Sequence, residues 1–431
     1  METLKTTGQI FPDGHAIEMV RQAGDEATNL ALLHWDGEQS RISTSLELNG
    51  RIYEPPKLSS TILRALRFPS ELRGFGSPAA LVKNLTAVIA KYSGLSDHLS
   101  RLTAFSLVAT WLADIVGAAP RLIVHGSPGR AVDQLMKILN CLCRRALVLA
   151  NVTSGGLLSL PFPLELTLLL RYEKMTKPLR QFLMASRTKG QFMVRGGELI
   201  KVFCPMVLQL EQPIGNPGLI AGIELPTRVI RRDVPFFDST AAEAIAKEFQ
   251  GQLLAYRLAN LQAARNSDFD PTELTSLVRE TARSIGVCFS SDPNLQAEIV
   301  ALLRNADAHE RVLSSTCQEA AAVEAMLFLC HGKNGKGNGA IHVGEIAAVL
   351  RVLNQGRTEI DIPSPRALGD TLRALGFMTE RLDRNGRGTM LCRDIRRRVH
   401  ETAMNFGVPS LSEGLPGCED CKFVRGVRKS K

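Results

Sequence analysis

The stretch RLIVHGSPGRAVDQLMKILN, residues 121–140, decides the fold of this chain of 431 residues. The apolar run Arg121–His125 has the length of a strand, and glycines at 126 and 129 follow it directly. Apolar side chains then recur at helical spacing over Gln134–Arg145. A strand that turns through glycines into a helix predicts an α/β layer, and the start of such a helix can hold a phosphate with backbone N–H groups.

The loop between this strand and this helix departs from a working nucleotide loop. Such a loop reads G-x-x-x-x-G-K-[ST], in which the lysine neutralises the phosphates and the hydroxyl holds magnesium. Ala131, Val132 and Asp133 stand at the positions of the glycine, the lysine and the hydroxyl residue. We therefore predict a degenerate loop that binds ATP or ADP weakly at most, formed by Gly126, Ser127, Pro128, Gly129, Arg130, Ala131, Val132 and Asp133.

The acidic half of the site is also missing. A strand near the loop should end in acidic residues that hold magnesium, but the apolar run Leu166–Leu170 ends in Arg171 and Tyr172. Because both halves have lost their chemistry, we predict no catalytic residue. Two alternatives stay open: residues 126–133 are only a strand-to-helix turn, or the site is active with Arg130 as its positive charge and Glu173 as its acid.

The rest of the chain divides by its apolar patterns and turn residues. Strands alternating with helices predict a mainly parallel sheet, with strands at Arg121–His125, Ala146–Asn151, Leu166–Leu170, Val202–Leu208 and Leu219–Leu225. We expect a small β-rich N-terminal part (1–56), a helical segment (57–120), a degenerate P-loop α/β core (121–235), a helical lid-like region (236–331), a linker (332–339), a winged helix-turn-helix (340–406) and a disordered basic tail (407–431).

Residues 340–406 carry the pattern of a winged helix-turn-helix. Helical patterns at 341–353 and 366–375 precede two strand-like runs, 377–381 and 389–393, that form the wing. In helix-turn-helix folds the second helix enters the major groove of DNA, and Gly386 and Gly388 would let the wing approach a phosphate closely. We predict DNA contacts by Arg366, Arg373, Arg381, Arg384, Arg387 and Arg393. The alternative is a winged helix that binds protein.

The composition of the chain limits its possible partners and its cellular compartment. The 52 Lys and Arg against 43 Asp and Glu leave a net charge of +9, which permits binding to nucleic acid. Nine scattered cysteines, without a signal peptide or a membrane span, predict a cytoplasmic protein. Cys418 and Cys421 form half of a zinc site, but no second pair stands at a suitable spacing, so we predict no metal.

Short motifs along most of the chain resemble one group of proteins. They are Pro12–Gly14, Arg51–Pro56, Leu63–Arg67, Cys141–Arg145, Ala185–Arg187, Arg195–Gly197, Pro235–Asp238, Leu254–Asn260, Ile341–Ile346 and Ser364–Gly369. Through these motifs, the chain from about residue 10 to residue 405 resembles bacterial P-loop ATPase-like proteins of phages, plasmids and other mobile elements, which are related to primase-helicase ATPases.

The resemblance implies a RecA/AAA-like core, DNA as a partner, and either a homo-oligomer or an active ATPase as a second partner. Because the site is degenerate, we expect a non-hydrolysing regulatory or assembly subunit of a mobile-element system. Two alternatives are an active DNA-dependent ATPase or helicase, and a DNA-binding regulator whose α/β domain is a scaffold for oligomers. The resemblance also implies that Arg187 and Arg195 face a nucleotide or a neighbouring subunit; otherwise they are solvated loop arginines.

Overall fold

The computed structural model describes residues 2–22, 30–126, 129–211, 222–227, 234–332, 339–353, 363–384, 386–408 and 418–429. The chain forms two compact units, Met1–Arg304 and Asn305–Lys431, and their boundary falls within helix α9 (Pro293–Thr316). Each unit has its own hydrophobic core.

The N-terminal part of the first unit consists of short strands. One sheet is antiparallel and has the order β2 (Gly8–Ile10), β3 (Ala16–Arg21), β4 (Leu30–Trp35) and β5 (Ser40–Ser43). The other has the order β1 (Thr3–Lys5), β7 (Arg51–Glu54) and β6 (Leu46–Leu48). The turn pairs Asp36–Gly37 and Asn49–Gly50 separate neighbouring strands, and both glycines adopt a positive φ that suits a tight turn.

The centre of the first unit is a five-stranded sheet in which each strand runs parallel to its neighbours. Its order is β14 (Ile223–Pro226), β8 (Arg121–His125), β13 (Met206–Leu210), β10 (Thr167–Tyr172) and β9 (Ala146–Ala150). The mainly parallel sheet predicted from the sequence is therefore confirmed. Parallel strands end at one edge, so the residues that follow β8, β13 and β10 lie on the same side of the sheet.

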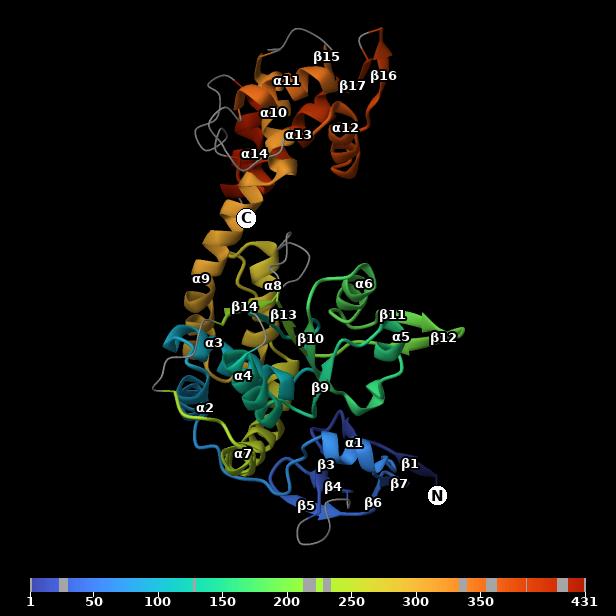
Figure 1. Cartoon of the computed structure of the whole chain (residues 1–431), viewed down its shortest axis with the longest axis vertical. Helices are drawn as coiled ribbons and strands as arrows, with labels where there is room; N and C mark the ends of the chain where they lie inside the picture. Colours follow the sequence, from blue (N-terminus) through green and yellow to red (C-terminus); the bar gives the residue numbers. More distant parts are fainter. Residues whose placement is uncertain are drawn as a thin grey trace. The chain divides into compact units, whose positions relative to one another are not determined.

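Both faces of the three central strands of this sheet are buried, as is usual for a parallel sheet, whereas the edge strands β14 and β9 have exposed residues. Alternate side chains of a strand point to opposite faces: Leu122 and Val124 of β8 enter one core, and Ile123 enters the other. The first core is covered by α2 (Pro78–Ser93), α3 (Asp97–Trp111), α4 (Arg130–Leu142) and α7 (Ser239–Arg265). The second is covered by α6 (Lys177–Ala185), which Figure 1 shows on the other side of the sheet.

Serine and aspartate caps fix where the helices of this unit begin. Ser77 Oγ accepts a hydrogen bond from the Ala80 N–H at 3.1 Å, and Asp238 Oδ1 accepts one from Ala241 at 2.8 Å. The remaining elements are α1 (Ser60–Ala65), α5 (Ser154–Leu157), η1 (Phe162–Leu164), the hairpin β11 (Phe192–Arg195) and β12 (Glu198–Lys201), α8 (Ser276–Gly286) and η3 (Val287–Phe289).

The second unit combines helices with a small antiparallel sheet of order β15-β17-β16. Its elements are α10 (Gln318–Gly332), β15 (Gly339–His342), α11 (Val343–Leu353), α12 (Pro365–Ala374), β16 (Glu380–Asp383), β17 (Gly386–Leu391), α13 (Arg393–Asn405) and α14 (Glu419–Lys429). Leu368 and Leu372 of α12 and Val399 of α13 enter one core together with Met326 of α10. Helix α10, expected in the lid-like region, therefore packs within this unit.

The C-terminal part contains two elements that the sequence analysis did not predict, α14 and β15. The tail was expected to be disordered, but α14 forms there and buries Cys421 and Val424. Strand β15 was not predicted, because its four residues are defined by pairing with the distant β17. Residues 333–338 of the expected linker lie outside the described residues. No helix in the described ranges is long and apolar enough to cross a membrane.

Candidate functional site

The glycine that opens the predicted nucleotide loop is held tightly against two neighbouring strand ends. The Gly126 N–H donates to the Leu210 carbonyl at 3.2 Å, and its own carbonyl accepts from Gln209 Nε2 at 3.0 Å. A Cβ at position 126 would lie 2.1 Å from Oγ1 of Thr227, so only glycine fits there. The sequence analysis predicted this glycine directly after a strand, where the structure has it, but missed Gln209 and Thr227, whose partners are far away in sequence.

The second glycine starts the helix. Gly129 is the N-cap of α4, its backbone is extended, and no side chain caps the helix there. Arg130 begins α4, where its guanidinium donates to Gln134 Oε1 and to the Val234 carbonyl, both at 3.1 Å, and lies 5.8 Å from the ring centroid of Phe236. These contacts direct Arg130 toward residues 234–236. Ser127 and Pro128 lie outside the described residues, and Ala131 is half-buried.

The residue at the lysine position belongs to the apolar core. Val132 is 2% exposed and packs with Leu135 and Met136 of α4 in the first core of the sheet. Its side chain carries no charge that could neutralise a phosphate.

The residue at the hydroxyl position is held by a charge from another strand. Asp133 Oδ1 lies 2.5 Å from Nη2 of Arg171, which stands near the end of β10. The two residues that the sequence analysis predicts as separate departures from a nucleotide site therefore contact each other. Asp133 and Arg171 carry opposite charges, and this was an indication of the pair that the sequence analysis did not use. Glu173, the alternative acid, follows the strand and is exposed.

A buried ion cluster holds the other end of α4. Glu18 of β3 pairs with Arg144, at 2.8 Å, with Arg145, and with Arg257 of α7, at 3.1 Å. Burial alone would raise the pKa of Glu18, but the three guanidinium groups hold that pKa below its ordinary value of 4.5. Arg257 also pairs with Asp114. Two of the resemblance motifs, Cys141–Arg145 and Leu254–Asn260, thus supply arginines to one structural cluster.

The arginines that the resemblance directed toward a nucleotide have partners within the chain. Arg187 forms an ion pair with Glu280 of α8, and Arg195 donates to the Leu158 carbonyl at 3.3 Å.

In the second unit, α12 presents its predicted arginines away from the core. The helix begins where the sequence indicates, because Ser364 Oγ accepts from the Ala367 N–H at 3.2 Å. Arg366 and Arg373 are exposed and stand two turns apart, whereas Leu368 and Leu372 are buried. Arg373 pairs with Asp370 one turn earlier, so its charge is partly compensated.

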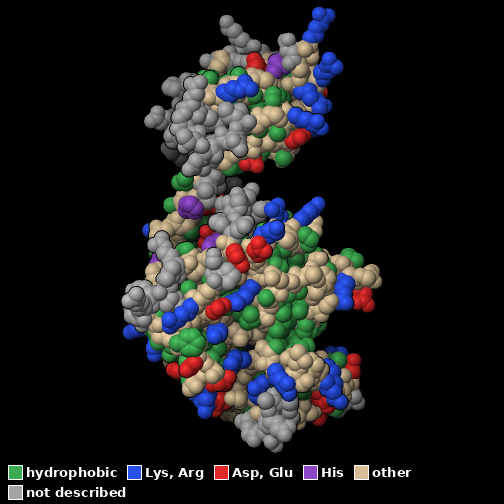
Figure 2. Space-filling model, in the orientation of Figure 1, with side chains coloured by type: hydrophobic (Ala, Val, Ile, Leu, Met, Phe, Trp, Pro, Cys, Tyr) green, Lys and Arg blue, Asp and Glu red, His purple; other side chains and the backbone are tan. Residues whose placement is uncertain are grey.

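The hairpin of β16 and β17 brings two predicted arginines face to face. Arg381 and Arg387 are directly opposed in the ladder, and both are exposed, as is Arg384 in the turn. Like charges that face each other across a ladder repel, and an anion between them would relieve that repulsion. Figure 2 shows Lys and Arg side chains gathered along this edge of the unit.

Three details of this module differ from the expectation. Arg393 was expected at the end of a strand, but β17 ends at Leu391 and Arg393 begins α13. Gly388 was expected to admit a phosphate, but it is buried, and a Cβ there would lie 2.3 Å from the Ile341 carbonyl of β15. The close approach that requires this glycine is to the neighbouring strand. Cys418 and Cys421, expected without partners, lie against two histidines.

Comparison with known proteins found no matching family and no similar curated protein. Among solved structures, a full-length MCM homolog from Methanopyrus kandleri aligns with a TM-score of 0.37 at 12% identity, over 67% of this chain and 77% of that chain. The C-terminal region of NrS-1 aligns with a TM-score of 0.35 at 10% identity, over 87% and 96% of the two chains. Drosophila ORC bound to DNA aligns with a TM-score of 0.18 at 10% identity, over 78% and 95%. Similarities at this level carry no argument about function.

Proposed function

We propose that this chain is a DNA-binding protein with a degenerate, non-hydrolysing P-loop core of the RecA/AAA-like kind. The observation that carries the proposal is the ion pair between Asp133 and Arg171. A hydrolysing site needs a lysine and a magnesium ion to neutralise the phosphates. Here the lysine position is an apolar core residue, Val132, and the magnesium position is occupied by a carboxylate that already has a cationic partner.

Weak nucleotide binding remains compatible with this site. Backbone N–H groups at the start of α4 can attract an anion, and the N-cap residue of that helix, Gly129, has no side chain to cap it. Such binding would not depend on magnesium. The alternative of an active ATPase requires Arg130 to neutralise the phosphates. Its guanidinium instead donates hydrogen bonds to Gln134 and to the Val234 carbonyl.

The proposed DNA-binding element is a winged helix-turn-helix in the second unit. Helices α11 and α12 are followed by the hairpin of β16 and β17, the order that this fold requires. Helix α12 would enter the major groove, and Arg366 would make its main contact with DNA, because Arg373 already has Asp370 as a partner. Arg381, Arg384 and Arg387 would contact phosphates, and Arg393 would add a positive charge at the start of α13.

The proposed role is that of a regulatory or assembly subunit in a mobile-element system. A core that does not turn over ATP cannot drive movement along DNA by itself, so it would act with an active ATPase partner or as a homo-oligomer. In the remaining alternative, a DNA-binding regulator, the α/β core is only the scaffold for that oligomer.

Binding of the full chain to fluorescent duplex and single-stranded DNA tests the function. Binding should weaken as salt rises, because arginine–phosphate contacts release counterions. The affinity should be the same with and without ATP and magnesium. Absence of binding to any DNA at low salt would overturn the proposal, and a large dependence on ATP with magnesium would favour the active ATPase. Light scattering of the same samples reports the oligomeric state.

A further inference from the structure

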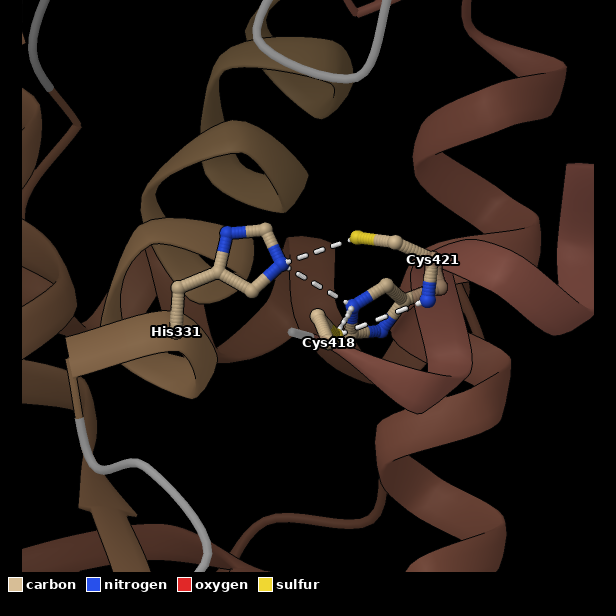
Figure 3. Close-up of side chains that lie close together, drawn as sticks. His331, Cys418 and Cys421 are labelled. Atoms are coloured by element: carbon tan, nitrogen blue, oxygen red, sulfur yellow. Dashed lines mark hydrogen bonds between the residues drawn. The ribbon is translucent and has the colours of Figure 1, made fainter. Parts of the chain in front are cut away.

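Four potential metal ligands from three parts of the second unit meet at one point. They are His331 in the last turn of α10, His400 of α13, and Cys418 and Cys421 at the start of α14. All their ligand atoms lie within 4.8 Å of one another. Figure 3 shows the ring of His331 and the thiol of Cys421 pointing toward each other across the gap between their helices.

Three of the distances between these atoms are close to those of a tetrahedral zinc site. Nε2 of His331 lies 3.1 Å from Nε2 of His400, and each nitrogen lies 3.3 Å from one sulfur, His331 from Cys421 and His400 from Cys418. Zinc binds nitrogen at about 2.0–2.1 Å and sulfur at about 2.3 Å, so tetrahedral angles place two nitrogens about 3.3 Å apart and a nitrogen and a sulfur about 3.5 Å apart. These two nitrogen–sulfur pairs and the nitrogen pair are therefore spaced much as they would be around one zinc ion.

Hydrogen bonds around the cluster orient its ligands. Nδ1 of His400 lies 2.7 Å from the Arg396 carbonyl, which can only accept, so the proton of a neutral ring is on Nδ1 and the lone pair is on Nε2. That lone pair faces the cluster, as a metal-binding histidine requires. The Cys421 N–H donates to Sγ of Cys418 at 3.5 Å, which favours a thiolate there.

We propose that His331, His400, Cys418 and Cys421 bind a structural zinc ion. Two cysteine sulfurs and two imidazole nitrogens are a common ligand set of structural zinc sites. All four positions are filled by protein, which is typical of structural rather than catalytic sites. His400 is 2% exposed and Cys421 is 3% exposed, so the site is closed to solvent on their side.

The zinc ion would fasten the end of the chain to the second unit. It ties α14 to α10 and α13, and α13 directly follows β17, the second strand of the hairpin that carries Arg381 and Arg387. A further contact joins the same helices, because the guanidinium of Arg397 lies 3.8 Å from the ring centroid of Phe423. This zinc site does not depend on the DNA-binding proposal and would stabilise the unit whatever its partner.

Metal analysis of the purified full chain tests the site. The expected result is one zinc per chain, and cobalt reconstitution should give the intense visible bands of a tetrahedral site with thiolate ligands. The cobalt spectra are recorded on the native chain, so this test does not require any variant to fold. Chelation should lower the thermal midpoint of the second unit.

Variants separate these ligands from other cysteines. Cys421→Ser and His400→Ala should each abolish stoichiometric zinc, whereas Cys392→Ser, at an exposed cysteine of the same unit, should retain it. The proposal is overturned if the reconstituted native chain retains no zinc or cobalt after dialysis. A disulfide between Cys418 and Cys421 in the protein purified under reducing conditions would overturn it as well.

Discussion

Asp133, in the first turn of α4, and Arg171, near the end of β10, form an ion pair of 2.5 Å although the two residues are 38 apart in sequence. In a hydrolysing P-loop site these two positions would hold magnesium together. Here the two side chains pair with each other instead.

Restoring the missing chemistry should create a magnesium-dependent nucleotide site. We expect the triple variant Val132→Lys, Asp133→Thr and Arg171→Asp to bind ATP more tightly with magnesium than without it, which the native chain should not do. The lost ion pair should cost about 1 kcal/mol or less, because both side chains are partly exposed. A lysine stem at position 132 can extend from the core toward the loop. Calorimetric titration with ATP measures the gain.

The matched control replaces Val132 by Met in the same background, which keeps the size of the side chain without its charge. If the folded lysine variant binds ATP no better than the methionine variant, position 132 does not correspond to the lysine of a nucleotide loop.

Gly126→Ala should destabilise the first unit. The added Cβ would collide with Oγ1 of Thr227, and the backbone there adopts a φ of 158°, which L residues rarely use. We expect a loss of about 1–3 kcal/mol, measured by thermal or urea unfolding. Thr227→Ala in the same chain should recover part of the loss because it removes that oxygen. Gly155→Ala has open space around it and serves as the control; equal effects at both glycines would contradict this account.

The buried cluster around Glu18 predicts acid sensitivity. Because the pKa of Glu18 is lowered in the folded chain, its contribution to stability is present above about pH 4.5 and is lost as pH falls below that value. Asp114 behaves alike, because Arg257 lowers its pKa against the effect of burial. Glu18→Gln should cost about 3–5 kcal/mol near pH 7, since it removes the carboxylate that Arg144, Arg145 and Arg257 share and leaves an excess of buried positive charge.

Thermal unfolding of this variant between about pH 7 and pH 3 checks the sign. The native midpoint should fall more steeply with acid than that of Glu18→Gln. The exposed Glu47→Gln should match the native chain throughout. If the thermal midpoints of the native chain and of Glu18→Gln fall equally with acid, Glu18 does not cause the acid sensitivity.

The two groups of arginines in the second unit should affect DNA binding differently. Arg381→Ala with Arg387→Ala should weaken binding to all sequences alike and reduce the salt slope by about 1 for each lost phosphate contact. Arg366→Ala should cost about 1–3 kcal/mol and reduce sequence preference, whereas Arg373→Ala should cost less because Asp370 compensates it. Anisotropy titrations at several salt concentrations distinguish these outcomes.

Arg64→Ala, at an exposed arginine of α1, is the control for lost positive charge. Wild-type affinity and salt slope in the Arg381 and Arg387 double variant would exclude the hairpin from the DNA interface.

The sequence predicted those features that depend on local patterns. The central strands, the glycine turn at 126 and the start of α12 at Ser364 follow from apolar periodicity and capping residues. The hairpin of β11 and β12 was missed because its short strands are largely exposed and lack a clear alternation. These strands are stabilised mainly by pairing with each other, which single-residue preferences do not report.

Contacts between distant residues account for most of what was missed at the sites. Asp133 and Arg171 were noted separately, and nothing in their spacing indicates that β10 brings them together. His331 and His400 come from two helices, so their positions match no compact spacing template for zinc, although Cys418 and Cys421 do supply the expected C-x2-C half.

ATP turnover by the full chain distinguishes a non-hydrolysing core from an active ATPase. Phosphate release should be measured with ATP and magnesium, with and without DNA, for the native chain and for Glu173→Gln. We predict no release above the background in any of these samples, because neither Val132 nor the Asp133–Arg171 pair can neutralise the phosphates or hold magnesium. Magnesium-dependent release that rises with DNA and disappears in Glu173→Gln would contradict the account.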